Sequence, residues 1–127
     1  MDLNQITLEV DSLDRAIAFY ETLGLRCIVL NPGRYARFEC PSGATTLSIH
    51  PADPPRIGAT VLYFEVEDVD RRHAELTAKG IRFDSAPIDT AWRWREARFS
   101  DPAGNHLCLF HAGPDRRFPP WRLAPRA

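Results

Sequence analysis

The chain lacks the features that mark secreted, membrane-spanning or nucleic-acid-binding proteins. Its three cysteines are odd in number and lack metal-type spacing, so we expect free thiols in a reducing compartment. No apolar run approaches the length of a bilayer span, and residues 1–5 show neither the basic nor the apolar region of a secretory signal. A formal net charge of -1 offers no electrostatic basis for binding nucleic acid or an anionic membrane. We therefore expect a cytoplasmic protein with neither of these partners.

What the chain does contain is an internal repeat. The segment 36–43 (ARFECPSG) is nearly repeated at 97–104 (ARFSDPAG), 61 positions later, and His50 and His111 lie the same distance apart. The repeat continues toward the N-terminus with a shift of 56 positions, since Gly24-Leu25-Arg26 corresponds to Gly80-Ile81-Arg82. A repeat this long that occurs only twice predicts two copies of one folding unit and not a solenoid.

Each copy shows the pattern of a βαβββ module. Residues 4–10 alternate apolar and polar side chains as a half-buried strand does, and Ser12 can cap the helix that Gly24 ends. Strands are expected at 25–30, 35–40 and about 44–50, and in the second copy around 62–66 and near 81–84, 92–99 and 105–111. The single domain is thus divided into module one at about 3–50, a linker at about 51–58, module two at about 59–112 and a tail at 113–127.

The tail is rich in proline and is not expected to form a helix. Its Phe118 and Trp121 suggest an arm that docks on the body of the protein or on a second subunit, and a loose tail is the alternative.

The paired modules, with Asp101-Pro102-Ala103-Gly104-Asn105 entering the last strand, resemble the vicinal oxygen chelate superfamily. This group includes glyoxalase I, extradiol dioxygenases and bleomycin-resistance proteins, and the resemblance covers roughly residues 3 to 112. It implies an α+β fold in which tandem βαβββ modules form a curved mixed sheet around a cleft, with helices on the convex side. A homodimer is the assembly that we expect. The cavity would be lined by Gln5, Thr7, Glu9, Val61, Tyr63 and Glu65.

Metal-dependent members of that superfamily bind a divalent ion through residues on the first and fourth strands of each module. Carried over to this chain, the positions fall on Gln5, Val61, Cys108 and either Leu47 or Ser48. Val61 has no lone pair to donate, and no carboxylate stands at the fourth-strand positions. No cofactor is therefore predicted, and a divalent metal is disfavoured.

The cavity residues that remain are aromatic and polar. Alternation along 92–99 places Trp92, Trp94, Glu96 and Arg98 on one face, and Arg37 is the first-copy counterpart of Arg98. Indole rings can stack on a planar ligand, and a guanidinium can hold a carboxylate. Ion pairing of Glu9 with Arg37 or of Glu96 with Arg98, and burial of the tryptophans against the tail or a partner, are the structural alternatives. The predicted ligand-binding residues are Gln5, Thr7, Glu9, Arg37, His50, Trp92, Trp94, Arg98 and Cys108.

Two classes of function compete, and the sequence leaves open whether the chain is an enzyme. The first is a glyoxalase- or bleomycin-resistance-like protein that binds a small organic molecule between its modules without a metal. The second is a lyase or isomerase of the glyoxalase type, in which Glu96 or Glu65 removes a proton next to a carbonyl and Tyr63 or Gln5 holds the oxyanion. A metal-dependent dioxygenase is a weaker variant of the second class. No residue pattern identifies the substrate.

Overall fold

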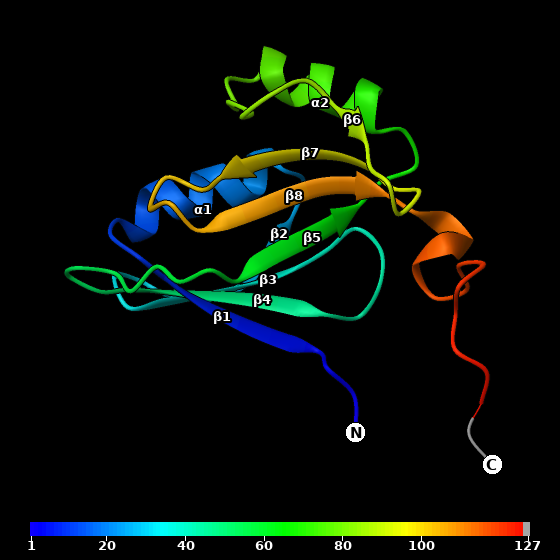
Figure 1. Cartoon of the computed structure of the whole chain (residues 1–127). Helices are drawn as coiled ribbons and strands as arrows, with labels where there is room; N and C mark the ends of the chain where they lie inside the picture. The colour runs from blue at the N-terminus through cyan, green and yellow to red at the C-terminus, as the bar shows by residue number, and fades with distance from the viewer. Residues whose placement is uncertain (126–127) are drawn as a thin grey trace. The chain divides into compact units, whose positions relative to one another are not determined.

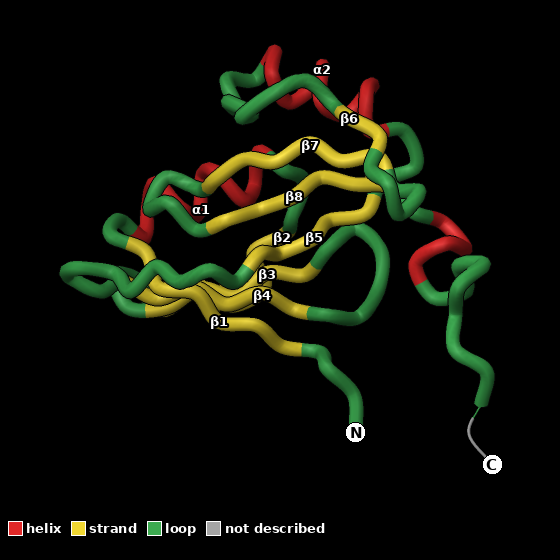
Figure 2. The backbone as a smooth tube through the Cα atoms, in the orientation of Figure 1, coloured by secondary structure: helices red, strands yellow, loops and turns green. Residues whose placement is uncertain are grey.

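The computed structural model describes residues 1–125 and shows an α+β protein built from two four-stranded mixed sheets, each accompanied by a helix. This is the predicted fold class, with two tandem modules. Figure 1 colours the chain from its N-terminus to its C-terminus, and Figure 2 distinguishes its helices, strands and loops. Their bounds are β1 Gln5–Val10, α1 Leu13–Thr22, β2 Arg26–Asn31, β3 Tyr35–Glu39, β4 Thr46–Pro51, β5 Val61–Glu65, α2 Val69–Ala78, β6 Ile88–Asp89, β7 Arg95–Ser100, β8 His106–His111 and the 3₁₀ helix η1 Gly113–Arg116.

The first sheet has the strand order β1-β4-β3-β2. Strand β1 pairs in parallel with β4, from Gln5 beside Thr46 to Val10 beside Pro51, and the other two pairings are antiparallel. Helix α1 is the crossover that parallel pairing requires, and it packs on β2, β3 and β4. Ser12 caps its start by accepting a hydrogen bond from the Arg15 backbone N–H, as predicted.

The second sheet repeats this plan with the order β5-β8-β7-β6. Helix α2 is capped by Asp68, whose carboxylate accepts a 3.0 Å hydrogen bond from the backbone N–H of Arg71. The ring of His73 on this helix lies 4.2 Å from that of Phe83, which in turn lies 4.7 Å from Phe99 on β7. One face of β7 therefore looks toward α2.

Two segments of the second module differ from the prediction. Residues 81–84 form no strand, because Phe83 makes only an isolated bridge to Phe99 and the short strand β6 lies further on at Ile88–Asp89. Strand β7 begins at Arg95, not at residue 92, because Arg93 has a φ of 69° and breaks the extended backbone.

The tail also differs from the prediction, since Gly113–Arg116 forms a 3₁₀ helix. Pro114 lies in its first turn, where the missing N–H of proline costs no hydrogen bond. Phe118 and Trp121 are both exposed, and the guanidinium carbon of Arg122 lies 4.3 Å from the centre of the Phe118 ring.

Contacts divide the described residues into two compact units. The first comprises residues 1–61 and 100–106, and the second comprises 62–99 and the chain from 107 onward. Each has its own buried apolar residues, such as Val10, Phe38 and Ile49 in the first and Leu76, Phe99 and Leu107 in the second. In residues 1–125 no helix is both long enough and apolar enough to cross a membrane.

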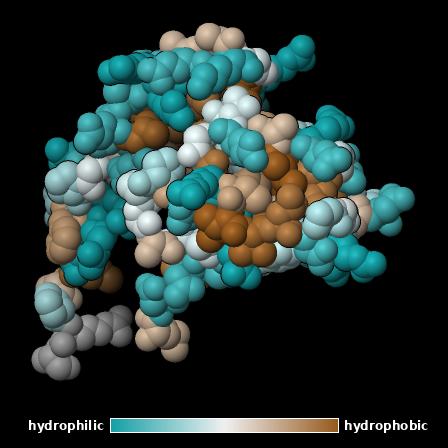
Figure 3. Space-filling view, turned by 180° about the vertical axis from the view of Figure 1, so that it is seen from behind, coloured by the Kyte–Doolittle hydropathy of each residue, from teal (hydrophilic) through white to brown (hydrophobic). Residues whose placement is uncertain are grey.

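Some apolar residues remain on the surface, and Figure 3 shows hydrophobic side chains exposed among hydrophilic ones. Three of them are consecutive on the edge strand β2: Ile28, Val29 and Leu30.

Candidate functional site

The first sheet has one face under α1 and one face turned away from it. Phe38 lies on the helix side, because its ring centre is 5.8 Å from that of Tyr20 on α1. Side chains alternate along a strand, so Tyr35 and Arg37 on β3 point to the opposite side. We call that side the first open face and define it by the four residues Gln5, Tyr35, Arg37 and Ser48.

These four side chains form a continuous hydrogen-bond network. The Gln5 amide nitrogen donates to the Ser48 hydroxyl, and the Gln5 amide oxygen accepts from Thr46. The hydroxyls of Ser48 and Tyr35 are 2.5 Å apart, and Arg37 Nε donates to the Tyr35 oxygen at 2.9 Å. The hydrogen bond to Ser48 and, more weakly, those from Arg37 and Gln5 lower the pKa of Tyr35. Because Ser48 and not Leu47 contacts Gln5, Ser48 is the fourth-strand residue on this face.

Glu9 and His50 lie beside each other on neighbouring strands of the same sheet. Arg56 binds the Glu9 carboxylate through its backbone N–H, its Nε and its Nη2, with a shortest distance of 2.5 Å. These hydrogen bonds lower the pKa of Glu9 to about 2. The partner of Glu9 is thus Arg56, and the alternative pairing with Arg37 is wrong.

A pocket of about 290 Å³ lies along β1 in this first unit. Its lining includes Thr7, Glu9, Arg56 and Asn105. The predicted ligand-binding residues Thr7 and Glu9 therefore line a cavity, although the Glu9 carboxylate is already occupied by Arg56.

The second sheet also has a face turned away from its helix, and this face is aromatic. The ring centres of Tyr63 on β5, Trp94 before β7 and Phe110 on β8 lie 4.9 to 5.9 Å from one another. Arg98 joins them, since its Nη2 donates to the Tyr63 hydroxyl at 3.2 Å. We call this surface the second open face and define it by Tyr63, Trp94, Glu96, Arg98, Cys108 and Phe110.

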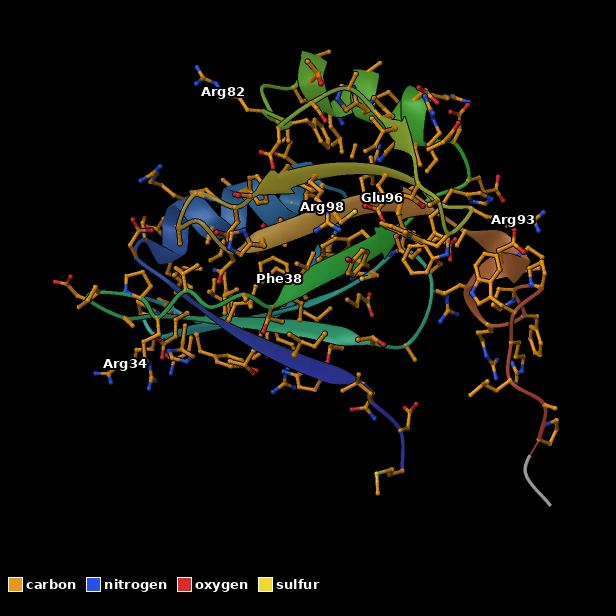
Figure 4. All side chains as sticks on the ribbon, viewed as in Figure 1. Arg34, Phe38, Arg82, Arg93, Glu96 and Arg98 are labelled. Atoms are coloured by element: carbon orange, nitrogen blue, oxygen red, sulfur yellow. The ribbon has the colours of Figure 1, made fainter. Side chains whose placement is uncertain are left out.

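Glu96 is the buried carboxylate of the second open face, and only 4% of the residue is exposed. Its Oε1 accepts a 3.2 Å hydrogen bond from Arg98, which confirms the ion pair considered above as an alternative to ligand binding. Among the described residues its Oε2 has no hydrogen-bond donor. A buried carboxylate oxygen without a donor is costly, so this atom is an acceptor that a ligand or a water molecule could satisfy. Figure 4 labels Glu96 and Arg98 on the ribbon.

Cys108 is fully buried on β8. Burial, and secondarily the charge of Glu96, raise the pKa of its thiol to about 11. A thiol in this state is a poor nucleophile, so the geometry gives Cys108 a packing role on this face.

Not every predicted residue joins these surfaces. The Glu65 carboxylate turns to the end of the module, where Oε2 accepts hydrogen bonds from the backbone N–H groups of Ala112 and Gly113 at 2.6 and 2.9 Å. Trp92 lies in the turn before β7 with 46% of its surface exposed, away from the strand that was expected to hold it. His50 is half-buried, and its Nδ1 lies 3.4 Å from the carbonyl oxygen of Pro51.

Phe110 was not predicted as a site residue, although it contacts both Tyr63 and Trp94. The signal was present in the sequence, because Phe110 lies two residues after Cys108 on the same strand and so shares its face.

The resemblance associates this fold with a divalent metal, and the donor atoms at the corresponding positions test that association. Both amide atoms of Gln5 are engaged in hydrogen bonds, and Val61 offers no donor atom. The fully buried Cys108 supplies a single thiol at the fourth-strand position of the second module. Within residues 1–125 no group of three or more His, Cys, Asp or Glu side chains is arranged to hold a metal ion. The residues present therefore do not fit a metal centre of this type.

Comparison with known proteins places these observations in a family. The family model described as Glyoxalase/Bleomycin resistance protein/Dioxygenase superfamily matches residues 2–109. An uncharacterized protein of Mycolicibacterium smegmatis is 32% identical over 110 residues, covering 86% of this chain and 92% of the relative. The uncharacterized protein YraH of Bacillus subtilis is 32% identical over 127 residues, covering 87% and 98%.

Solved structures agree with this relationship. TnmS3, an antibiotic binding protein from a Streptomyces species, superposes with a TM-score of 0.76 and 28% identity, covering 89% of this chain and 97% of its own. A lactoylglutathione lyase from Agrobacterium tumefaciens gives a TM-score of 0.74 at 23% identity, covering 87% and 93%. At that identity the likeness to the lyase shows the fold alone.

Proposed function

The chain belongs to the glyoxalase/bleomycin resistance protein/dioxygenase superfamily, as its sequence predicted, and we propose from this premise that it binds a small organic molecule on the second open face. The observation that carries the proposal is the aromatic cluster of Tyr63, Trp94 and Phe110 beside the buried, unpartnered Oε2 of Glu96. Broad aromatic surface with a few polar groups aimed into it is typical of small-molecule sites.

The chemistry of this face indicates a planar ligand. The half-exposed ring of Tyr63 and the indole of Trp94 offer surfaces for stacking, while Arg98 supplies a donor and Glu96 an acceptor at one edge. The likeness to an antibiotic binding protein supports binding without chemistry, and planar antibiotics are accordingly the first compounds to test. The cleft shared by both modules, expected from the resemblance, stays a prediction, as does the cytoplasmic location.

The test is a fluorescence titration with a panel of planar aromatic antibiotics. A ligand on this face should quench the indole emission saturably, and Trp94→Phe should remove most of that response. Trp121→Phe is the matched control, because Trp121 lies exposed in the tail, and it should leave the dissociation constant unchanged. If no compound quenches saturably, or if Trp94→Phe behaves like the wild type, the proposal fails.

An enzymatic role is the second candidate function. Of the two predicted bases, Glu96 is favoured over Glu65 by its environment. Glu96 Oε2 receives no donor, whereas Glu65 accepts two backbone N–H groups that hold it in place. Glu96 would remove a proton next to a substrate carbonyl and return it to the neighbouring carbon, while the Tyr63 hydroxyl would donate to the oxyanion. The Tyr63 proton is available for this role because its oxygen accepts from Arg98.

The enzymatic role is tested by supplying the wild type with the hemithioacetal of methylglyoxal and glutathione, a substrate of the glyoxalase type. Glu96→Gln should abolish turnover, and Glu65→Gln should retain it. Unchanged turnover in Glu96→Gln would exclude Glu96 as the base, and no turnover in the wild type would remove support for this reaction.

A further inference from the structure

The first open face carries a positive charge that no described residue balances. Arg37 is half-buried, yet no carboxylate in the described part of the chain forms an ion pair with it. Its counterpart in the repeat, Arg98, pairs with Glu96 at 3.2 Å. A half-buried guanidinium has lost part of its hydration, so it gains from a negatively charged partner.

The contacts of Arg37 leave its terminal nitrogens available. Its Nε donates to the Tyr35 oxygen, and its guanidinium carbon lies 5.5 Å from the centre of the Tyr35 ring. No hydrogen bond within residues 1–125 is formed by its Nη1 or Nη2. These two nitrogens supply the paired N–H groups that bind the two oxygens of a carboxylate.

The hydroxyl groups of the network also favour a ligand that accepts hydrogen bonds beside Arg37. Ser48 is fully buried and accepts from the Gln5 amide, and its hydroxyl lies 2.5 Å from that of Tyr35, where either oxygen can be the donor. The Tyr35 oxygen accepts from Arg37 Nε, so this hydroxyl lies directly beside the guanidinium. When Ser48 is the donor of this pair, the Tyr35 proton has no acceptor within the network and can be donated to a ligand. The hydrogen bonds that lower the pKa of Tyr35 also make it a stronger donor.

We infer that Arg37 and Tyr35 form a binding site for a carboxylate or another anionic oxygen on the first open face. Gln5 and Ser48, at two of the positions that hold a metal in related proteins, serve here to orient Tyr35. The guanidinium repels a divalent cation at short range, so the face is suited to bind an anionic oxygen directly. This inference concerns the first unit and does not depend on the aromatic face of the proposed function.

The inference can be tested with benzoate as the anionic probe and benzamide as its neutral isostere. NMR spectra of the ¹⁵N-labelled protein report the Nε–Hε signal of Arg37, whose proton forms the hydrogen bond to Tyr35. Benzoate should shift this signal saturably and bind at least about tenfold more tightly than benzamide, which corresponds to one charge-assisted interaction.

Substitutions distinguish binding of benzoate at Arg37 from a general attraction of the anion to positively charged residues. Arg37→Gln should abolish saturable benzoate binding, Arg37→Lys should retain part of it, and Tyr35→Phe should weaken it severalfold. Arg34→Gln is the matched control, because Arg34 is an exposed arginine in the turn before β3, and it should bind benzoate like the wild type (Figure 4). Amide spectra verify that each variant is folded.

Four results would overturn the inference. The first two are the absence of any saturable shift with benzoate and equal binding of benzoate and benzamide. The other two are benzoate binding that persists unchanged in folded Arg37→Gln, and stoichiometric binding of Zn²⁺ or Ni²⁺ that shifts the Gln5 side-chain amide. Failure of the antibiotic titration would leave this result untouched, because the two experiments observe residues of different units.

Discussion

Tyr20 donates a 2.8 Å hydrogen bond to the carboxylate of Asp101, which lies 81 residues later in the chain. Both side chains are buried in the first unit. Asp101 also accepts from the backbone N–H groups of Ala103 and Asn105 and from the Asn105 side chain, so one carboxylate organises the whole 101–105 turn. The other repeat has Cys40 at this position, which cannot form such a set of hydrogen bonds.

Tyr20→Phe keeps the buried ring and removes only the hydroxyl. Burial, together with the charge of Asp101, raises the pKa of Tyr20, so the phenol stays neutral and donates at all ordinary pH values. We expect the substitution to lower the free energy of unfolding by about 1.5–3 kcal/mol, the usual contribution of a hydrogen bond to a charged group. Urea denaturation measures it, and an unchanged midpoint with an unchanged slope would contradict the assigned role.

Because Glu9 forms an ion pair with Arg56, its contribution to the free energy of unfolding should depend on pH. The side-chain and backbone hydrogen bonds from Arg56 lower the pKa of Glu9 from 4.5 to about 2 in the folded chain. A depressed pKa stabilises the folded state fully above about pH 4.5, and this contribution is lost as the pH falls toward 2. NMR titration of the Glu9 carboxyl carbon should show the low pKa.

In Arg56→Gln the pKa of Glu9 should rise toward its ordinary value. Arg15→Gln removes the same charge from the exposed surface of α1 and should leave the pKa of Glu9 unchanged. Equal titration of Glu9 in the wild type and in Arg56→Gln would show that the pair does not form in solution.

The buried thiol of Cys108 should resist alkylation. With a pKa of about 11, only on the order of one thiol in a thousand is ionised at pH 8. Iodoacetamide should therefore modify the half-buried Cys27 before Cys108 in the folded protein, and both after unfolding in urea. Mass spectrometry of peptides distinguishes the two sites. Rapid modification of Cys108 in the folded chain would restore it as a candidate nucleophile.

The donor atoms of the first open face predict low affinity for divalent metals. The amide of Gln5 is engaged by Ser48 and Thr46, and the unbalanced charge of Arg37 opposes a cation. Elemental analysis of the purified protein should find no stoichiometric Zn, Ni, Mn or Fe. One full equivalent of any of these metals, retained after dialysis against a weak chelator, would contradict this expectation.

The predicted homodimer requires an apolar surface, and the edge strand β2 offers one. Ile28, Val29 and Leu30 are consecutive and exposed, a combination that edge strands usually avoid unless they are covered. Val29→Lys should shift a dimer toward monomer in sedimentation velocity. Ile88→Lys changes an equally apolar, exposed position on β6, an edge strand of the second sheet, and serves as the control. A monomeric wild type at high concentration would exclude the predicted dimer.

Much of the fold could be predicted because its determinants are local or repeated. The duplicated segments around Phe38 and Phe99, the caps Ser12 and Asp68 and the alternation in β1 identify two βαβββ modules and, by resemblance, the family. The errors lie where a backbone conformation overrides the pattern. The left-handed turn at Arg93 removed Trp92 from β7, and the segment after α2 kept only one bridge, at Phe83.

The site could be predicted only in part, because alternation decides the face of a residue and not its partner. The sequence by itself determined the two open faces, the aromatic character of the second, and the absence of donor atoms at Val61. Only the tertiary structure decided that Glu9 is paired with Arg56 and that Glu65 is held by backbone N–H groups. It also decided that, among the described residues, Arg37 has no carboxylate partner and Glu96 Oε2 has no hydrogen-bond donor. These outcomes depend on distances between segments far apart in the chain, which no local pattern specifies.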